Sequence, residues 1–381
     1  MQFVFSAEQD QFRATVRRFL NDTSPTSEVR RLMETASGFD ASVWQRLTQE
    51  LALTGLAIPE TWGGAGFGMV ELSIAMEEMG RALLCAPFLS TAILAAKAIE
   101  LVGNEAEKAR LLPAIAAGEQ RATLAITEPD GHPALSTVTL SAVRRNNTFT
   151  LNGAKKFVLD GCSADTLLVA GREPGTSGLQ GLSLFLVAAD APGLARQPLR
   201  TLDPTRKQAA LTFRDVPATL LGRFGEAGQG LQRTLDLAAI ALANEMVGGA
   251  GRLLEDTIEF TRLRMQFGRP IASFQAIKHR AAEMLLSVEL AKSAAYYAAA
   301  AADDDDPEIP VLASLAKAAA SETYLQTAID AIQLHGGVGF TWDQDTHLWF
   351  KRAKTSEVLF GDPAWHRERM IEETVRLEQQ P

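Results

Sequence analysis

Residues 333–342 read Gln-Leu-His-Gly-Gly-Val-Gly-Phe-Thr-Trp and close a long helical pattern. The glycines are Gly336, Gly337 and Gly339. Glycine just past a helix satisfies the last carbonyls of that helix and lets backbone approach a ligand closely. A C-cap followed by a turn explains two of these glycines without a ligand, so both interpretations stay open for the glycines alone. The chain continues through a segment that ends at residues 359–362 in Leu-Phe-Gly-Asp.

Composition limits the class of protein. The chain has 381 residues and is 46% apolar, which predicts two or three domains of ordinary globular character. Its formal charge of -9 argues against nucleic acid, which needs a clustered basic surface. No apolar run has the length of a membrane span, and the N-terminus lacks signal-peptide character. The two cysteines, Cys85 and Cys162, make neither a disulfide framework nor a zinc site, which favours a cytoplasmic location.

Residues 1–120 predict an all-helical domain. Ser6 and Gln9 form a capping box before the first helix, and Asp40 or Ser42 begins another. A glycine-rich break at residues 58–66 lacks the Gly-Lys-Ser/Thr ending of a phosphate loop. Further helices are predicted at residues 70–79 and at 90–101, the second capped by Ser90.

Residues 121–224 predict a β domain. Short β-rich runs alternate with turns, at residues 123–127, 137–144, 148–151, 165–170, 182–187 and 209–213. Asn146-Asn147 and Asn152-Gly153 are typical hairpin turns. Strands at this spacing favour a small barrel or sandwich.

Residues 225–381 predict a helical bundle. Helices are expected over residues 231–264, 273–302 and 310–334, the first of them apolar on nearly every face and therefore buried. Gly248, Gly249 and Gly251 would let a neighbouring helix pack closely. The aspartates at 303–306 precede Pro307, which indicates a solvated loop rather than a metal site.

The order helical, β, helical, together with the stretch at 333–342, resembles the acyl-CoA dehydrogenase family over essentially the whole chain. The resemblance implies an α+β fold with an N-terminal helical domain, a middle β domain and a C-terminal four-helix bundle. It implies FAD as cofactor, an acyl-CoA thioester as substrate and electron-transfer flavoprotein as acceptor. In this family a carboxylate takes a proton from the α carbon while the flavin accepts hydride from the β carbon.

In the family, each FAD is bound partly by the C-terminal helices of the dimer mate, and this group of motifs is kept here. Residues 264–275 match the family pattern Arg-x-x-Phe-Gly-x-x-Ile...Gln, and residues 333–340 match Gln-x-x-Gly-Gly-x-Gly-aromatic. The resemblance implies that Arg264 meets the pyrophosphate, since a guanidinium fork suits phosphate oxygens. The implied FAD contacts of this group are Arg264, Gln266, Phe267, Ile271, Phe274, Gln275, Gln333, Gly336 and Gly337.

The group of motifs that serves the chain's own FAD is damaged. Ile126 and Thr127 lie in the run that begins the family motif Thr-Glu-Pro-x-x-Gly-Ser-Asp, but the Gly-Ser is replaced by His132-Pro133. Proline has no N–H to donate to a phosphate. Phe157 stands where the family has a shielding Trp, and Leu159 where it has a flavin-facing Thr.

The catalytic base is also missing. Aligning Leu-Phe-Gly-Asp with the family's Tyr-Glu-Gly-Thr places Phe360 at the base position, and the family's second base location falls on Ala238. Glu245 lies on the same helix face as Ala238, about 10 Å further along, and Asp362 follows Phe360 by two residues. Glu245 has a buried ion pair as its structural alternative. Glu357, His132 and His335 are further groups with the required chemistry.

Motifs that reach a neighbour's FAD are kept while those for the chain's own FAD are lost. This pattern predicts one subunit of a heteromeric acyl-CoA dehydrogenase, in a heterotetramer with a complete homologous chain, as in actinobacterial enzymes for steroid side chains. One alternative is a homotetramer that uses Glu245 or Asp362 as a displaced base. Another is a non-catalytic scaffold that binds acyl-CoA.

Overall fold

The computed structural model describes residues 5–145 and 148–379, so the predicted Asn146-Asn147 turn lies outside the described residues. The chain divides into two compact units. The bundle unit comprises Met1–Arg30, Met69–Leu84 and Ala239–Pro381, and the β unit comprises Arg31–Gly68 and Cys85–Ala238. The second unit thus combines strands with part of the N-terminal helical region.

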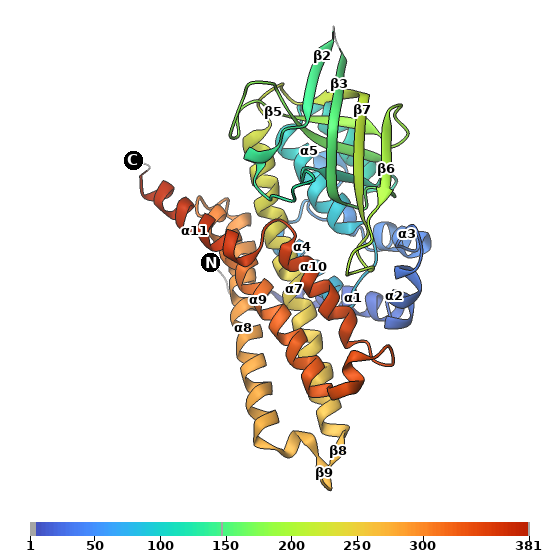
Figure 1. Cartoon of the computed structure of the whole chain (residues 1–381), viewed down its shortest axis with the longest axis vertical. Coiled ribbons are helices and arrows are strands. Elements are labelled where there is room, and N and C mark those ends of the chain that lie inside the picture. Colours follow the sequence, from blue (N-terminus) through green and yellow to red (C-terminus); the bar gives the residue numbers. More distant parts are fainter. Residues whose placement is uncertain (1–4, 146–147, 380–381) are drawn as a thin grey trace. The chain divides into compact units, whose positions relative to one another are not determined.

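The bundle unit is built on long helices, which Figure 1 shows as blue, yellow, orange and red ribbons. Its elements are α1 (Ala7–Thr23), α4 (Met69–Arg81), most of α7 (Gly228–Leu263), α8 (Gln275–Asp303), α9 (Ile309–His335), α10 (Thr346–Val358) and α11 (Pro363–Glu378). Helix α9 packs against α8, α10 and α11. The capping box is confirmed, because Gln9 N donates to Ser6 Oγ while Ser6 N donates to Gln9 Oε1.

Glycines set how closely the helices of this unit approach α7. A Cβ on Gly248 would lie 1.9 Å from the carbonyl oxygen of Glu77, and one on Gly80 would lie 1.9 Å from that of Glu245. A Cβ on Gly249 would meet the Tyr324 ring at 2.5 Å. The predicted close packing is therefore confirmed at Gly248 and Gly249, whereas Gly251 has ordinary spacing.

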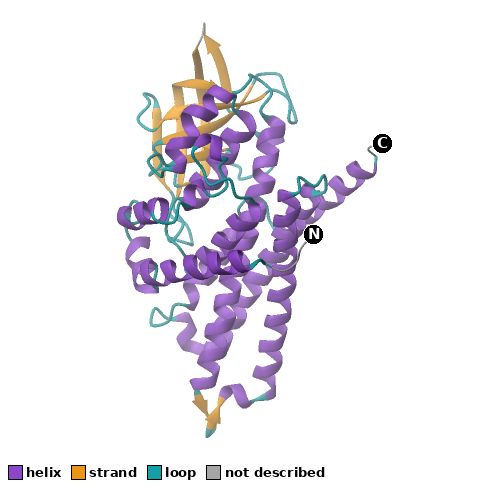
Figure 2. Cartoon of the chain, turned by 180° about the vertical axis from the view of Figure 1, so that it is seen from behind, coloured by secondary structure: helices purple, strands orange, loops and turns teal. Residues whose placement is uncertain are grey.

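The β unit carries the strands of the large sheet, which Figure 2 draws in orange together with a short hairpin at residues 265–270 of the bundle unit. They are β1 (Ala122–Ala125), β2 (Ser141–Arg145), β3 (Thr148–Leu159), β4 (Thr166–Arg172), β5 (Leu182–Ala188), β6 (Leu194–Pro198) and β7 (Gln208–Leu221). The pairings β4–β2, β2–β3, β3–β7, β7–β5 and β5–β4 close a ring, so this sheet is a barrel around an apolar core.

Helical segments complete the unit. They are α3 (Ala41–Gln49), η1 (Leu53–Gly55), η2 (Glu60–Trp62), η3 (Leu89–Ala95), α5 (Ala96–Val102), α6 (Glu105–Ala116) and η4 (Leu135–Thr137). Asp40 caps α3, as predicted, by accepting from the N–H groups of Ser42 and Val43. Helix α2 (Thr26–Met33) crosses from one unit to the other along the chain.

Two local predictions were wrong. Asn152-Gly153 is no hairpin turn but lies inside β3, where the register with β7 shifts between Leu151 and Gly153 and the Gly153 φ is 142°. A bulge and a turn both favour glycine, so the residue types do not distinguish them. Ser90 is no helix cap, because it lies within the π-helical η3 and its hydroxyl donates to Asp160 Oδ2 at 2.6 Å.

Helix α7 is a core helix. It is long and apolar enough to cross a membrane, but 89% of its most apolar window is buried. The acidic run that begins at the last residue of α8 also has a structural role, because Asp303 accepts from the main-chain N–H groups of Met69 and Val70 at the start of α4. Among the described residues, no group of His, Cys, Asp and Glu side chains could hold a metal ion.

Candidate functional site

A short hairpin connects α7 to α8 and carries the kept arginine motif. Strand β8 (Met265–Gln266) pairs with β9 (Arg269–Pro270) around a turn at Phe267 and Gly268, whose φ values are 54° and 76°. Two consecutive left-handed residues are the signature of a type I′ turn. Arg264 stands at the base of the hairpin, where its carbonyl accepts from Ile271 N at 2.9 Å.

The glycine stretch lies at the same end of the bundle unit as the hairpin. Helix α9 ends at His335, and Gly336 follows with a φ of 68°, which confirms the predicted helix stop. The His335 ring stacks on Phe260 with 4.1 Å between centroids, and the Phe260 carbonyl accepts from Arg264 N. This stack ties the end of α9 to the residues that precede the hairpin.

His335 has a structural role here. Its Nδ1 lies 2.7 Å from the Ala331 carbonyl oxygen, and the ring is buried. Burial lowers the pKa of His335, which outweighs the opposing effects of the Ala331 carbonyl and of Asp256. A neutral, stacked imidazole suits the joint between two helices better than proton transfer.

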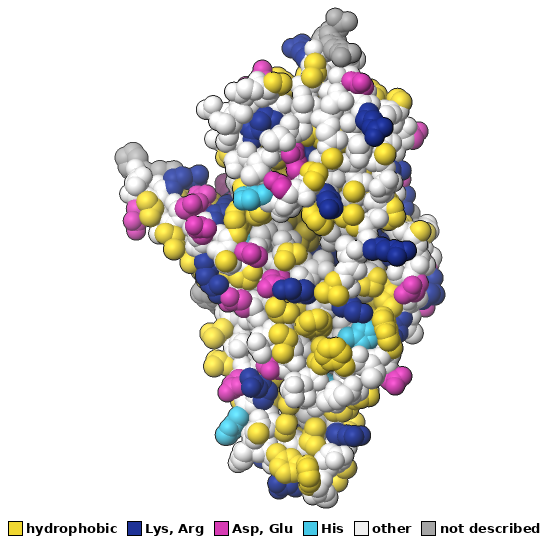
Figure 3. Space-filling model, viewed as in Figure 1, with side chains coloured by type: hydrophobic (Ala, Val, Ile, Leu, Met, Phe, Trp, Pro, Cys, Tyr) yellow, Lys and Arg dark blue, Asp and Glu magenta, His cyan; other side chains and the backbone are white. Residues whose placement is uncertain are grey.

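This end of the bundle unit is open. Phe267 is 90% exposed and Phe340 is 79% exposed. A Cβ built on Gly268, Gly336 or Gly337 would meet nothing within 4 Å. Within residues 5–145 and 148–379, Arg264 forms no ion pair. Figure 3 shows hydrophobic side chains gathered around the hairpin end of the unit. An uncovered apolar surface beside an unpaired guanidinium is typical of a binding surface.

The other kept motif residues lie on the same segments. Phe274 packs edge-on against Phe267 with 6.0 Å between centroids, and the Arg269 guanidinium lies 4.0 Å from the Phe274 ring centre. Exposed side chains at this end are those of Gln266 in β8, Gln275 at the start of α8 and Gln333 near the end of α9, and Ile271 is half-buried. The structure therefore brings the predicted bundle-side residues together at one end.

The corresponding segment of the β unit is closed on itself. Ile126 is buried and Thr127 half-buried at the end of β1, and Thr127 O accepts from Lys156 N at 2.8 Å. Glu128 Oε1 accepts from Lys155 Nζ at 3.0 Å and from Leu140 N at 2.7 Å, while Lys155 is fully buried. These hydrogen bonds hold both ends of the loop at residues 128–140 in place.

A buried arginine strengthens the same loop. Arg172 donates to the carbonyls of Val138, Leu135 and Ser136 and, from the other side, to those of Gly178 and Gln180. The loop polar groups at the altered motif also bond locally, because His132 Nδ1 accepts from Ala134 N at 3.1 Å. With no N–H on Pro133, this loop offers few donors to a phosphate. It does not fit FAD pyrophosphate in the way that the family motif implies.

The two substituted positions on β3 differ from one another. Leu159 is buried, with its carbonyl accepting from Thr123 Oγ1 at 2.6 Å, so it presents no polar group. Phe157 has a φ of 59° and is 38% exposed. A Cβ on Gly131 would lie 3.5 Å from the Phe157 ring, which places this ring beside the altered loop.

Glu245 occupies a buried ion pair, the structural alternative to a displaced base. Its Oε1 lies 2.7 Å from Arg352 Nη1, and both side chains are almost fully buried. A carboxylate held by a guanidinium is stabilised in its ionised form and is a poor proton acceptor. Ala238, at the family's second base location, is also buried.

The family's base position falls on Phe360, in the turn between α10 and α11, so it carries no carboxylate. Asp362 caps α11 by accepting from Trp365 N at 2.8 Å. Glu357 is paired with Lys354. Both carboxylates near the base position are thus engaged in local structure.

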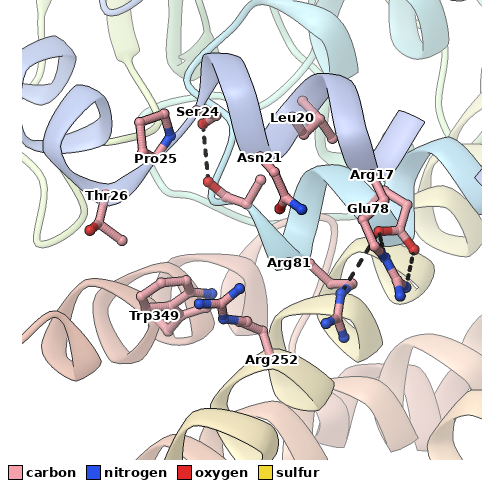
Figure 4. A pocket seen from close by; sticks show the side chains of 11 residues that line it. Arg17, Leu20, Asn21, Ser24, Pro25, Thr26, Glu78, Arg81, Arg252 and Trp349 are labelled. Carbon is pink, nitrogen blue, oxygen red and sulfur yellow. Dashed lines mark hydrogen bonds and ion pairs between the residues drawn. The ribbon is translucent and has the colours of Figure 1, made fainter. Parts of the chain in front are cut away.

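A cavity of about 420 Å³ lies elsewhere in the bundle unit (Figure 4). Three arginines line it, but each is already paired: Arg17 with Glu78, Arg81 with Glu255 and Arg252 with Asp256. Because these carboxylates neutralise the guanidinium groups, the cavity lacks the excess charge of an anion site. The hairpin end remains the candidate site.

Comparison with known proteins identifies the family. Models of the N-terminal, middle and C-terminal domains of acyl-CoA dehydrogenase match residues 6–119, 123–216 and 228–374. The acyl-CoA dehydrogenase IpdE2 of Mycobacterium tuberculosis is 32% identical over 93% of this chain and 94% of its own length.

Solved structures agree. The steroid acyl-CoA dehydrogenase Tcur3481-Tcur3483, solved as a variant, is similar with a TM-score of 0.88 and 30% identity over 98% of this chain and 99% of that one. The ChsE4-ChsE5 complex from Mycobacterium tuberculosis has a TM-score of 0.89 and 25% identity, with both chains fully covered. The chain belongs to the acyl-CoA dehydrogenase family, whose members are FAD-dependent oxidoreductases acting on acyl-CoA thioesters.

Proposed function

We propose that this chain is the subunit of a heteromeric acyl-CoA dehydrogenase that lacks its own catalytic base and completes the FAD site of a homologous partner chain. The observation that carries the proposal is the contrast between two FAD-binding regions. The hairpin end has exposed aromatic rings, open glycines and an Arg264 that forms no ion pair in the described part of the chain, whereas polar groups of the loop at residues 128–140 are engaged in hydrogen bonds within the chain.

The partner would supply the chemistry that this chain lacks. FAD, when bound, accepts a hydride from the β carbon of the thioester while the base takes the proton from the α carbon. On this chain the Arg264 guanidinium would bind pyrophosphate oxygens, and Gly336 and Gly337 would let backbone N–H groups approach them. Phe267 and Ile271 would cover the adenine side.

Two similar structures support a pair of unlike chains, because both are named as pairs, Tcur3481-Tcur3483 and ChsE4-ChsE5. The first is described as a steroid acyl-CoA dehydrogenase. We therefore propose an acyl-CoA with a bulky, steroid-like acyl group as substrate. We propose electron-transfer flavoprotein as the acceptor, which the family resemblance implies and which a similar solved structure, described as the electron transferring flavoprotein of Acidaminococcus fermentans, supports.

The homomeric alternative with a displaced base has less support. It requires a free carboxylate, but Glu245 is paired with Arg352 and Asp362 caps α11. Exposed leucines on α8, Leu285, Leu286 and Leu290, are compatible with assembly of either kind.

Arg264 gives a direct test. In the complex of this chain with its homologous partner, Arg264→Ala should weaken FAD binding by roughly ten- to a hundred-fold, because a charge-assisted contact to phosphate is lost. Flavin retained after dilution and gel filtration is the measurement. Arg262→Ala, an exposed arginine in the last turn of α7, is the matched control and should leave flavin unchanged. Equal retention in both variants would contradict the proposal.

A further inference from the structure

A buried amine on α9 supports the turn at the family's base position. Lys317 is fully buried, and its Nζ lies 3.0 Å from Ser321 Oγ, 3.1 Å from Glu357 O and 3.1 Å from Gly361 O. The two carbonyls belong to the last turn of α10 and to the connection that follows it. A single side chain therefore holds main-chain groups on both sides of Phe360.

This connection needs support because its backbone is unfavourable. Phe360 has a φ of 63°, a conformation that a bulky L-residue rarely adopts, and Gly361 follows with a φ of 112°. The local main-chain bond from Gly361 N to Val358 O is long, at 3.3 Å. The Trp365 ring closes the other side, since a Cβ on Gly361 would lie 2.4 Å from Trp365 Cε3.

The partners of Lys317 are two carbonyl oxygens and one hydroxyl, and Nζ donates to all three. A charged amine has three N–H donors for these acceptors whereas a neutral amine has two, so the protonation state of Lys317 changes how the turn is held. Burial lowers the pKa of Lys317 to about 7, against the opposing effect of Glu357 and Asp362. Within the described residues no carboxylate forms an ion pair with Lys317, so protonation would bury an ammonium without a direct counter-charge, and opening of the turn to water would relieve that cost.

Charged groups face Lys317 from both neighbouring helices. Glu357 on α10 is paired with Lys354, and Asp362 caps α11. On α11, the pKa of His366 is lowered to about 3, mainly by burial and further by the charges of Lys317 and Arg369. His366 therefore stays neutral over the range in which Lys317 titrates.

We propose that Lys317 is a positioning residue that holds the Phe360–Gly361 turn in its left-handed conformation, so that the vacated base position keeps a fixed backbone. The importance of this turn for the reaction rests on the proposed function. The positioning itself does not, and its tests need neither flavin nor a partner chain.

Hydrogen exchange of the full-length chain tests the positioning. Lys317→Met removes the amine while keeping an unbranched side chain, and Lys278→Met on the exposed surface of α8 is the matched control. Amides at residues 355–362 should exchange roughly ten-fold faster or more in Lys317→Met, with α7 residues 240–250 unchanged. Ser321→Ala, a milder change, should give a smaller rise in the same segment. Unchanged exchange at 355–362, or an equal rise throughout the bundle unit, would overturn the proposal.

A titration separates this role from simple packing. The chain has five tryptophans, and fluorotryptophan labelling gives each a ¹⁹F resonance, with Trp365 assigned through Trp365→Phe. We expect the Trp365 resonance to shift with a midpoint near pH 7 in the unmodified chain, to stay constant in Lys317→Met and to keep its midpoint in His366→Gln. A midpoint that survives Lys317→Met, or one that disappears in His366→Gln, would assign the titration to another group.

Discussion

The hairpin end of the bundle unit and the loop at residues 128–140 of the β unit carry the two halves of the family's FAD-binding motifs, and they differ in how far their polar groups are already used. Among the residues that the structure describes, Arg264 at the hairpin end has no ion-pair partner, and Phe267 is 90% exposed. In the loop, Glu128 accepts from Leu140 N and from the β3 residue Lys155, and the Val138 carbonyl accepts from the buried Arg172. The polar groups at the hairpin end can still bind a ligand, whereas those of the loop that are bonded within the chain cannot.

The largest expected effect concerns Glu245. Glu245→Ala leaves Arg352 buried without its carboxylate, which should lower the free energy of unfolding by about 3–5 kcal/mol. Denaturant unfolding of the purified chain measures this. Glu245→Leu combined with Arg352→Met, which replaces the pair by apolar side chains, should recover much of the loss. If Glu245→Gln instead abolished activity of the complex at unchanged stability, Glu245 would be the base.

Restoring the family motif in the loop at residues 128–140 tests whether this loop limits flavin binding. His132→Gly with Pro133→Ser restores the family's Gly-Ser and returns one main-chain N–H. We expect the chain expressed alone to bind more flavin than the parent, by roughly the ten-fold that one hydrogen bond to a charged group contributes. Equilibrium titration with FAD is the measurement. His279→Gly with Pro310→Ser, outside the loop, is the control, and equal gains in both variants would show that the loop is not the limiting part.

The smallest effect is the pH dependence of the same loop. Burial raises the pKa of Glu128, but Lys155, Thr139 and the Leu140 amide outweigh it, and the net shift is downward. A lowered carboxyl pKa contributes stability that is present above the unfolded value, about 4.5, and is lost as the pH falls through the folded value. Glu128→Gln should therefore flatten the acid side of the stability curve. Thermal unfolding of both proteins at several pH values from 3 to 6 is the measurement. The same acid-side slope in Glu128→Gln as in the unmodified chain would contradict the prediction.

Much of this architecture follows from local sequence signals. The Ser6 capping box, a helix start at Asp40 or Ser42, the stop of α9 at Gly336 and a small barrel or sandwich were predicted because each depends on residues near in sequence or on a repeated pattern. Strand β6 was missed because it is short and largely exposed, so it lacks the apolar alternation of a half-buried strand.

Local sequence signals do not predict contacts between residues that are far apart in the sequence. The partner of Glu245 is 107 residues away, and the carbonyl partners of Lys317 are 40 and 44 residues away. Lysine in an alanine-rich helix is compatible with solvent exposure, so only its placement beside the α10–α11 connection shows that it is buried. Ser90 was misassigned for the same reason, because its hydroxyl bonds to Asp160 across 70 residues.

The central claim is that this chain completes a partner's FAD site and holds little flavin of its own. Flavin per chain, measured by absorbance after denaturation, tests it most directly when the chain is expressed alone and together with a homologous acyl-CoA dehydrogenase chain. We predict little flavin for the chain alone and about one FAD per pair in the complex. One FAD per chain in the protein expressed alone would contradict the account.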